Sequence, residues 1–69
     1  MNRTSVSSSN IASIGYDPTS CTLEVEFHSG LIYQYFNVPE SVFDALMGAA
    51  SHGQYFNSRI KERYKFRRV

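Results

Sequence analysis

Residues 22–36 read TLEVEFHSGLIYQYF. Apolar and polar side chains alternate through the first half of this stretch, so that Leu23, Val25 and Phe27 point to one face and the intervening residues to the other. A period of two predicts a half-buried strand over Thr22–His28. Ser29-Gly30 then predicts a turn, because glycine readily takes a positive φ. Leu31–Phe36 is predicted to return as an antiparallel strand.

The length of this turn decides which face the third-strand side chains occupy. A three-residue loop at 28–30 pairs Phe27 with Leu31, whereas a two-residue loop would place Tyr33 and Tyr35 beside Glu24 and Glu26. We expect the three-residue loop, because it collects six side chains on one buried face: Leu23, Val25, Phe27, Leu31, Tyr33 and Tyr35. In this register the two tyrosines are core residues, with an aromatic stacking platform as the alternative. Glu24 and Glu26 are then expected on an exposed, acidic sheet face.

Upstream, Ile11–Tyr16 predicts a further strand, and the turn at Asp17–Ser20 joins it to the next. Residues 1–9 are serine-rich and predict a flexible lead-in, although their last residues could begin a strand. The resulting fold class is α+β, with a three-stranded antiparallel meander followed by two helices on one face. Residues 10–69 make a single domain.

Downstream, Pro39 and Glu40 are typical of the first turn of a helix. This helix is expected to end at Ser51-His52-Gly53, with Gly53 as a left-handed cap. A shorter helix is predicted over Gln54–Glu62, and its inner face continues to Tyr64. The tail at 64–69 could extend this helix, add a short strand or fray.

Size and composition narrow the class of protein. A chain of 69 residues with 42% apolar content forms a small core. The single cysteine, Cys21, excludes an intramolecular disulfide, and no apolar run approaches the roughly 18 residues that span a bilayer. The polar N-terminus lacks the apolar centre of a secretory signal. We therefore expect a soluble cytoplasmic protein with no membrane partner.

No catalytic or metal site is apparent. Cys21, His28 and His52 are not at ligand spacing from one another, so we expect neither a metal nor another cofactor. A Cys21–His28 nucleophilic pair would require the strands to bring both residues together, and Cys21 is more simply a small packed residue. Glu24 and Glu26 fit a solvated sheet face better than an acid–base pair. We expect a protein that is not an enzyme.

Several motifs in series resemble the KTSC domain, a module at the C-terminus of some lysyl-tRNA synthetases that also occurs as a small stand-alone protein. Tyr33-Gln34-Tyr35 matches its Tyr-x-Tyr motif, preceded by Phe27-x-x-Gly30 and followed by Val38-Pro39-Glu40. Ala50-Ser51-x-Gly53, Tyr55-Phe56-Asn57-x-x-Ile60 and Tyr64 complete the series, which covers roughly residues 6–66. The resemblance implies this fold and a suggested role in RNA binding, with no catalytic residues to carry over.

The charge distribution is polarised. Residues 59–69 hold six basic residues and one acid, a net charge of +5, whereas residues 1–58 hold one basic residue against five acids, a net charge of −4. A basic terminus of this kind favours an anionic partner. On a continuous helix, Arg59 and Arg63 would share a face with Tyr55 one turn earlier. The candidate nucleic-acid-binding residues are therefore Tyr55, Arg59, Lys61, Arg63, Lys65 and Arg67.

The leading hypothesis is a non-enzymatic module that binds RNA, with tRNA as a candidate partner, in which Arg and Lys pair phosphates and Tyr55 stacks on a base. A solvated charged face without a ligand remains the simpler interpretation. A second function class is a protein-interaction module that binds an acidic partner or itself. Self-association as a weak homodimer would use Ile32 and Phe36, which the favoured register leaves exposed.

Overall fold

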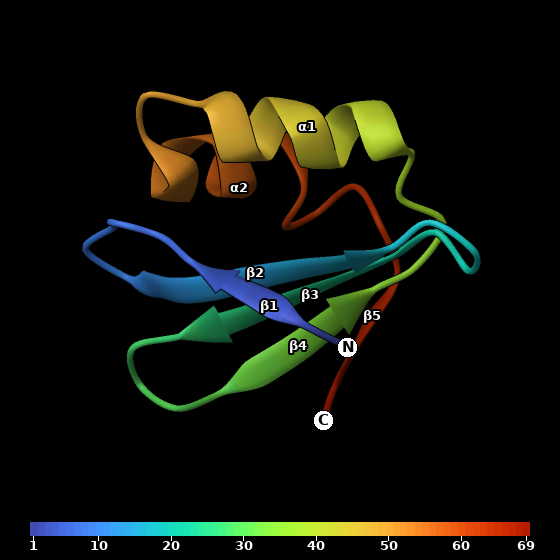
Figure 1. Cartoon of the computed structure of the whole chain (residues 1–69), viewed down its shortest axis with the longest axis horizontal. Helices are drawn as coiled ribbons and strands as arrows, with labels where there is room; N and C mark the ends of the chain where they lie inside the picture. Colours follow the sequence, from blue (N-terminus) through green and yellow to red (C-terminus); the bar gives the residue numbers. More distant parts are fainter.

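The computed structural model describes all 69 residues as one antiparallel sheet with two helices on one face (Figure 1). The strands follow one another across the sheet in the order β1-β2-β3-β4-β5. Their bounds are β1 Arg3–Ser5, β2 Ile11–Asp17, β3 Thr22–Phe27, β4 Ile32–Tyr35 and β5 Phe66–Arg68, and the helices are α1 Glu40–Gly48 and α2 His52–Arg59. Neither helix is long and apolar enough to cross a membrane.

The central meander has the predicted register. Leu23 lies opposite Tyr35 and Val25 opposite Tyr33, and the backbone N–H of Phe27 donates to the carbonyl of Leu31 at 2.9 Å. Gly30 supports this loop with a φ of 95°. Tyr35 is a core residue at 4% exposure, whereas Leu31, expected on the buried face, is 41% exposed beside the turn of the hairpin.

The prediction of three strands was wrong, because short strands extend the sheet at both edges. β1 pairs with β2 and lies within residues 1–9, which were expected to form a lead-in outside the sheet. β5 pairs with β4, so the strand is the correct choice among the three alternatives left open for the tail. Each of these strands has only three residues, Arg3-Thr4-Ser5 in β1 and Phe66-Arg67-Arg68 in β5. Segments this short and polar show no alternation from which a strand can be predicted.

The boundary between the helices also differs from the expectation. α1 ends at Gly48, and Gly53 is the second residue of α2 rather than a left-handed cap. Two side chains fix this boundary. The hydroxyl of Ser51 accepts from the backbone N–H of Gln54 at 3.2 Å, which begins α2, and His52 Nδ1 donates to the carbonyl of Leu46 at 2.8 Å, which satisfies the end of α1.

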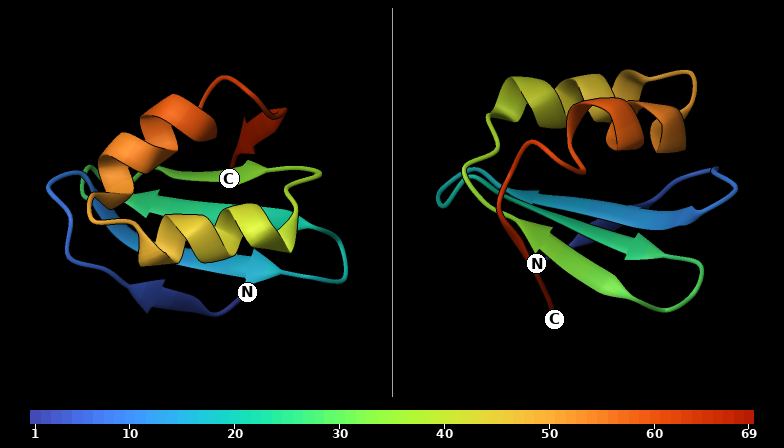
Figure 2. Two further views of the ribbon diagram at one scale, coloured as in Figure 1. Left: turned by 90° about the horizontal axis from the view of Figure 1, so that it is seen from above. Right: turned by 180° about the vertical axis from the view of Figure 1, so that it is seen from behind.

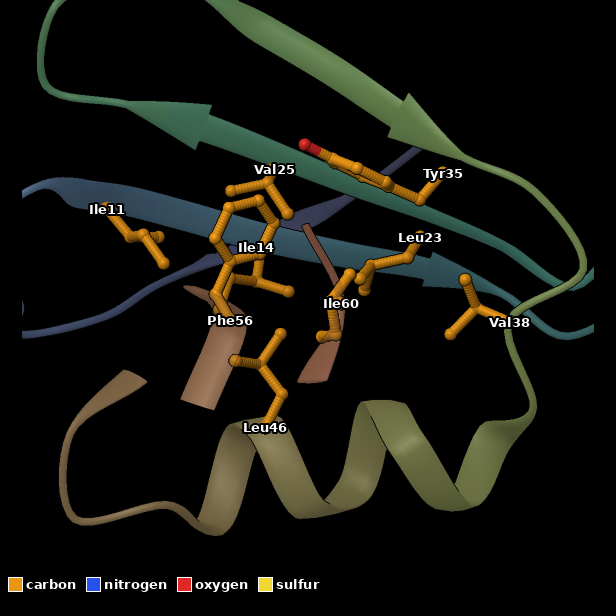
Figure 3. Close-up of a cluster of buried hydrophobic side chains, with 9 residues drawn as sticks. All are labelled: Ile11, Ile14, Leu23, Val25, Tyr35, Val38, Leu46, Phe56 and Ile60. Atoms are coloured by element: carbon orange, nitrogen blue, oxygen red, sulfur yellow. The ribbon is translucent and has the colours of Figure 1, made fainter. Parts of the chain in front are cut away.

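The core lies between the helices and the sheet (Figures 2 and 3). It consists of nine buried side chains: Ile11, Ile14, Leu23, Val25, Tyr35, Val38, Leu46, Phe56 and Ile60. A register shift between Ile11 and Ser13 lets both Ile11 and Ile14 face the core, although strict alternation would have separated them. Tyr16 of β2 ties α1 to this layer, since its ring stacks on Phe43 at 5.0 Å between centroids.

The opposite face of the sheet carries a polar network rather than the exposed acids that were predicted. Glu24 is only 7% exposed. Arg3 crosses from β1 to form an ion pair and hydrogen bond with the Glu24 carboxylate, and Gln34 of β4 donates to the same group at 2.9 Å. Because β1 was not predicted, its cover over this face was not predicted either.

Candidate functional site

The basic residues near the C-terminus lie on three consecutive segments. Arg59 is the last residue of α2, Lys61 and Arg63 lie in the following turn, and Arg67 is in β5. The predicted helix to Glu62 is therefore too long, and Arg59 and Arg63 do not share a face on one continuous helix. Backbone hydrogen bonds of a turn end the helix. The N–H of Lys61 donates to the carbonyl of Phe56, and the N–H of Arg63 donates to the carbonyl of Ile60.

All six basic side chains between Arg59 and Arg68 are exposed, and none forms an ion pair. Both ion pairs of the chain belong to Arg3, which contacts Glu24 and Glu26. The acidic body of the protein therefore does not neutralise its basic end by direct contact. These cations remain accessible to a ligand.

β5 distributes its basic residues between two faces of the sheet. Arg67 lies opposite Gln34, whose side chain belongs to the outer polar face, and Arg68 lies opposite Tyr33 on the helix-facing side. Paired residues in antiparallel strands project to the same face. Lys65 precedes the strand, and its carbonyl accepts from the N–H of Phe36 at 2.9 Å. The basic residues therefore surround the edge of the sheet rather than form one flat patch.

Tyr55 and Tyr33 are less accessible than a stacking platform requires. Tyr55 is half-buried and packs against the core, as does Tyr33. Tyr35 is more deeply buried, and this burial, with a smaller contribution from the neighbouring Tyr33, raises the pKa of its phenol to about 12. The core interpretation of the Tyr33–Tyr35 pair is correct for Tyr35 and partly so for Tyr33.

A cleft of about 490 Å³ opens beside the basic segment, between α2 and the β3–β4 hairpin. Five aromatic rings contribute to its walls: Phe27, Tyr33, Tyr35, Phe56 and Phe66. Its polar lining comes from Asn10, Ser29, Asn57, Lys61 and Glu62, and Leu31 lies at its apolar side. Lys61 is the one candidate nucleic-acid-binding residue that lines this cleft, together with Tyr33 and Tyr35 of the Tyr-x-Tyr motif.

The rings of the cleft form one connected aromatic cluster. Phe56 meets Phe27 and Tyr35 edge-on, with centroids 5.5 Å and 5.4 Å apart. Phe66 of β5 packs on Tyr33 at 5.7 Å and on Tyr35 at 5.5 Å. Such contacts stabilise ring pairs beyond the area that they bury. Phe66 nevertheless stays 55% exposed, so the C-terminal strand presents an aromatic ring to solvent at the mouth of the cleft.

The three residues considered for metal binding or nucleophilic chemistry lie apart, and each contacts a different backbone carbonyl. Cys21 lies in the β2–β3 turn with its thiol near the carbonyl of Pro18 at 3.9 Å. His28 Nε2 bonds to the carbonyl of Ser8 at 2.9 Å, and His52 bonds to Leu46 as described above. The fold thus gives each of the two histidines a backbone partner, and it does not gather the three residues into one cluster.

Comparisons with known proteins agree with this architecture. The model of the family described as "KTSC domain" matches residues 7–64. An uncharacterized protein of Stutzerimonas stutzeri is 44% identical over 100% of this chain and 99% of its own length. A lysine–tRNA ligase of a Nostoc species is 48% identical over 78% of this chain, a match that spans 10% of the ligase. The crystal structure of a KTSC domain protein from Yersinia pestis has a TM-score of 0.96 and 43% identity, covering 99% of this chain and 96% of that one.

Proposed function

The chain belongs to the KTSC domain family, and from this premise we propose that it is a small cytoplasmic RNA-binding module with no reaction of its own. One observation carries the proposal: six exposed basic side chains lie between Arg59 and Arg68, and none is paired with an acid. The similarity to a segment of lysine–tRNA ligases supports RNA, and tRNA in particular, as the anionic partner.

The proposed mode of binding is contact with the phosphate backbone. Arg59 and Arg63 offer guanidinium groups that can form paired hydrogen bonds with phosphate oxygens, and Lys61 and Lys65 add point charges. Contacts of this kind supply affinity and position but carry no sequence information. Binding releases condensed counterions, so the affinity must fall as the salt concentration rises.

The test is titration of labelled protein with bulk tRNA at about 50 mM and about 150 mM salt, followed by two-dimensional amide NMR. We expect shifts between Tyr55 and Arg68 that weaken at the higher salt. Arg59→Gln/Arg63→Gln should weaken binding and lower the slope of log affinity against log salt by roughly one for each contact removed. Absence of shifts at low salt would remove RNA as the partner.

A matched control separates local contacts from net charge. Thr19→Glu/Ser41→Glu changes the total charge by the same amount as the arginine variant, at exposed positions outside the basic segment. We expect this control to retain the salt slope of the wild type. An equal loss of slope in both variants would mean that net charge alone attracts the RNA.

A protein-interaction module that binds an acidic partner or itself is the alternative. Ile32 and Phe36, expected to be exposed dimer contacts, are half-buried in the single chain, and the carbonyl of Ile32 accepts from the N–H of Val69. Less apolar surface is therefore available there than the sequence indicated. Light scattering over a range of protein concentrations distinguishes self-association from a monomer that binds RNA.

A further inference from the structure

We propose that the cleft between α2 and the β3–β4 hairpin is a pocket for a single unstacked nucleobase of an RNA strand. This inference rests on the proposed function. It adds a binding site for a base to the phosphate contacts that the basic residues provide. Its volume of about 490 Å³ lies within the range of roughly 300–1,000 Å³ in which small-ligand pockets fall.

The aromatic wall provides the surface on which a base would stack. Phe66 is the most accessible of the rings, at 55% exposure, and it is held in place by Tyr33 and Tyr35 behind it. A planar base has a π-face, and stacking on an aromatic side chain contributes to affinity for every base. An exposed ring that is fixed from behind loses little conformational freedom when the base arrives.

The polar side of the cleft matches the edge of a base. The amides of Asn10 and Asn57 each carry a donor and an acceptor, which is the mixture that a base edge presents. Asn57 is exposed, and its side chain takes part in none of the side-chain hydrogen bonds of α2, so its amide is free for a ligand. The Asn10 Oδ1 already accepts from the Ser8 hydroxyl at 3.2 Å, so Asn57 is the residue that offers a ligand both its donor and its acceptor.

The two charged residues of the cleft give the occupant an orientation. Lys61 is exposed and unpaired, and it attracts the phosphate of the bound nucleotide. The Glu62 carboxylate repels phosphate but accepts hydrogen bonds from the amino or imino N–H groups of a base. The phosphate is therefore directed toward Lys61 and the basic segment, and the base edge toward Glu62. Because bases in a duplex are stacked and paired, only an unpaired nucleotide can enter.

The experiment compares a short single-stranded RNA with a strand of the same length that keeps every ribose and phosphate but lacks the bases. The two strands have equal numbers of phosphates, so phosphate contacts alone bind them equally. Fluorescence anisotropy at one fixed salt concentration should show the intact strand binding at least about five-fold more tightly. Asn57→Ala and Phe66→Leu should each reduce this ratio while leaving the affinity for the abasic strand unchanged.

The control is Val69→Ala, which removes an exposed apolar side chain three residues from Phe66 and outside the cleft. It should keep the ratio of the wild type. Equal binding of both strands by the wild type would overturn the pocket and leave the phosphate-binding function standing. Failure of both strands to bind would overturn the pocket and the proposed function together. Asn57→Ala is on the surface of α2, so it tests the pocket even if the Phe66 variant disturbs β5.

Discussion

The missing side chain of Gly15 lets β1 lie close to β2. A Cβ atom at this position would come within 2.6 Å of the backbone carbonyl oxygen of Asn2 and 3.0 Å of Arg3 Cγ. Backbone cannot yield as a flexible side chain does, so Gly15→Ala must displace the N-terminal strand. We expect a loss of about 1–3 kcal/mol in the free energy of unfolding, measured by urea denaturation.

Gly48→Ala is the matched control for this substitution. No heavy atom lies within 4 Å of a Cβ built on Gly48, which is the last residue of α1. Alanine there should be neutral or stabilising by up to about 1 kcal/mol, because it is the better helix former. Equal destabilisation by both variants would show that contact with β1 is not the reason for the effect at Gly15.

The buried carboxylate of Glu24 makes stability depend on acid pH. Burial raises its pKa, but hydrogen bonds from Gln34 and Arg3 and the charge of Arg3 outweigh burial, so that the net pKa lies below the ordinary value of 4.5. At pH values between the folded and unfolded pKa the unfolded chain binds more protons. The stabilisation is therefore complete well above pH 4.5 and is lost as the pH falls toward the lowered folded pKa.

Arg3→Met removes two of the interactions that lower this pKa while keeping a long side chain. We predict that its free energy of unfolding falls less steeply between about pH 5 and pH 3 than that of the wild type, as followed by urea denaturation at each pH. The variant should also be less stable at neutral pH, because the Glu24 carboxylate loses its cation. Parallel pH profiles for the two proteins would contradict this account of Glu24.

At the scale of the elements, Ser51 separates the two helices by beginning the second. Its hydroxyl accepts from the backbone N–H of Gln54, and the first turn of α2 has no acidic residue that would stabilise the start of the helix in addition. Ser51→Ala should lower the free energy of unfolding by about 1 kcal/mol. Ser51→Asp restores an acceptor and adds favourable charge at the helix start, so thermal denaturation should show its stability returning to that of the wild type or above.

Strands with a clear pattern could be predicted, and those without one could not. Alternation over Thr22–His28 and the short loop after it were enough to predict the register of β3 and β4. β1 depends on the space above Gly15 and on the contact between Arg3 and Glu24, which are tertiary features. The end of α1 likewise depends on His52, whose ring bonds to the carbonyl of Leu46, six residues earlier in the chain.

At the scale of the whole molecule, the charged part of the candidate site could be predicted and the cleft could not. The concentration of basic residues in one segment can be read directly from the sequence. The cleft brings together Asn10, Phe27, Asn57 and Phe66, which are far apart in sequence and meet only when the tail returns to β4. The tail pattern was compatible with three structures, so Phe66 carried no signal of its position.

The pairing of β5 with β4 has a consequence for the order of folding. β1, β2 and β3 each pair with the next strand along the chain, so the contacts among β1 to β4 form by closing short loops. β5 reaches its partner only across both helices, which makes this contact the most distant in sequence between neighbouring strands. Distant contacts incur the larger loop-closure entropy. We therefore expect folding to begin in the meander and to finish with β5, so that the aromatic cleft is complete only when the last strand has docked.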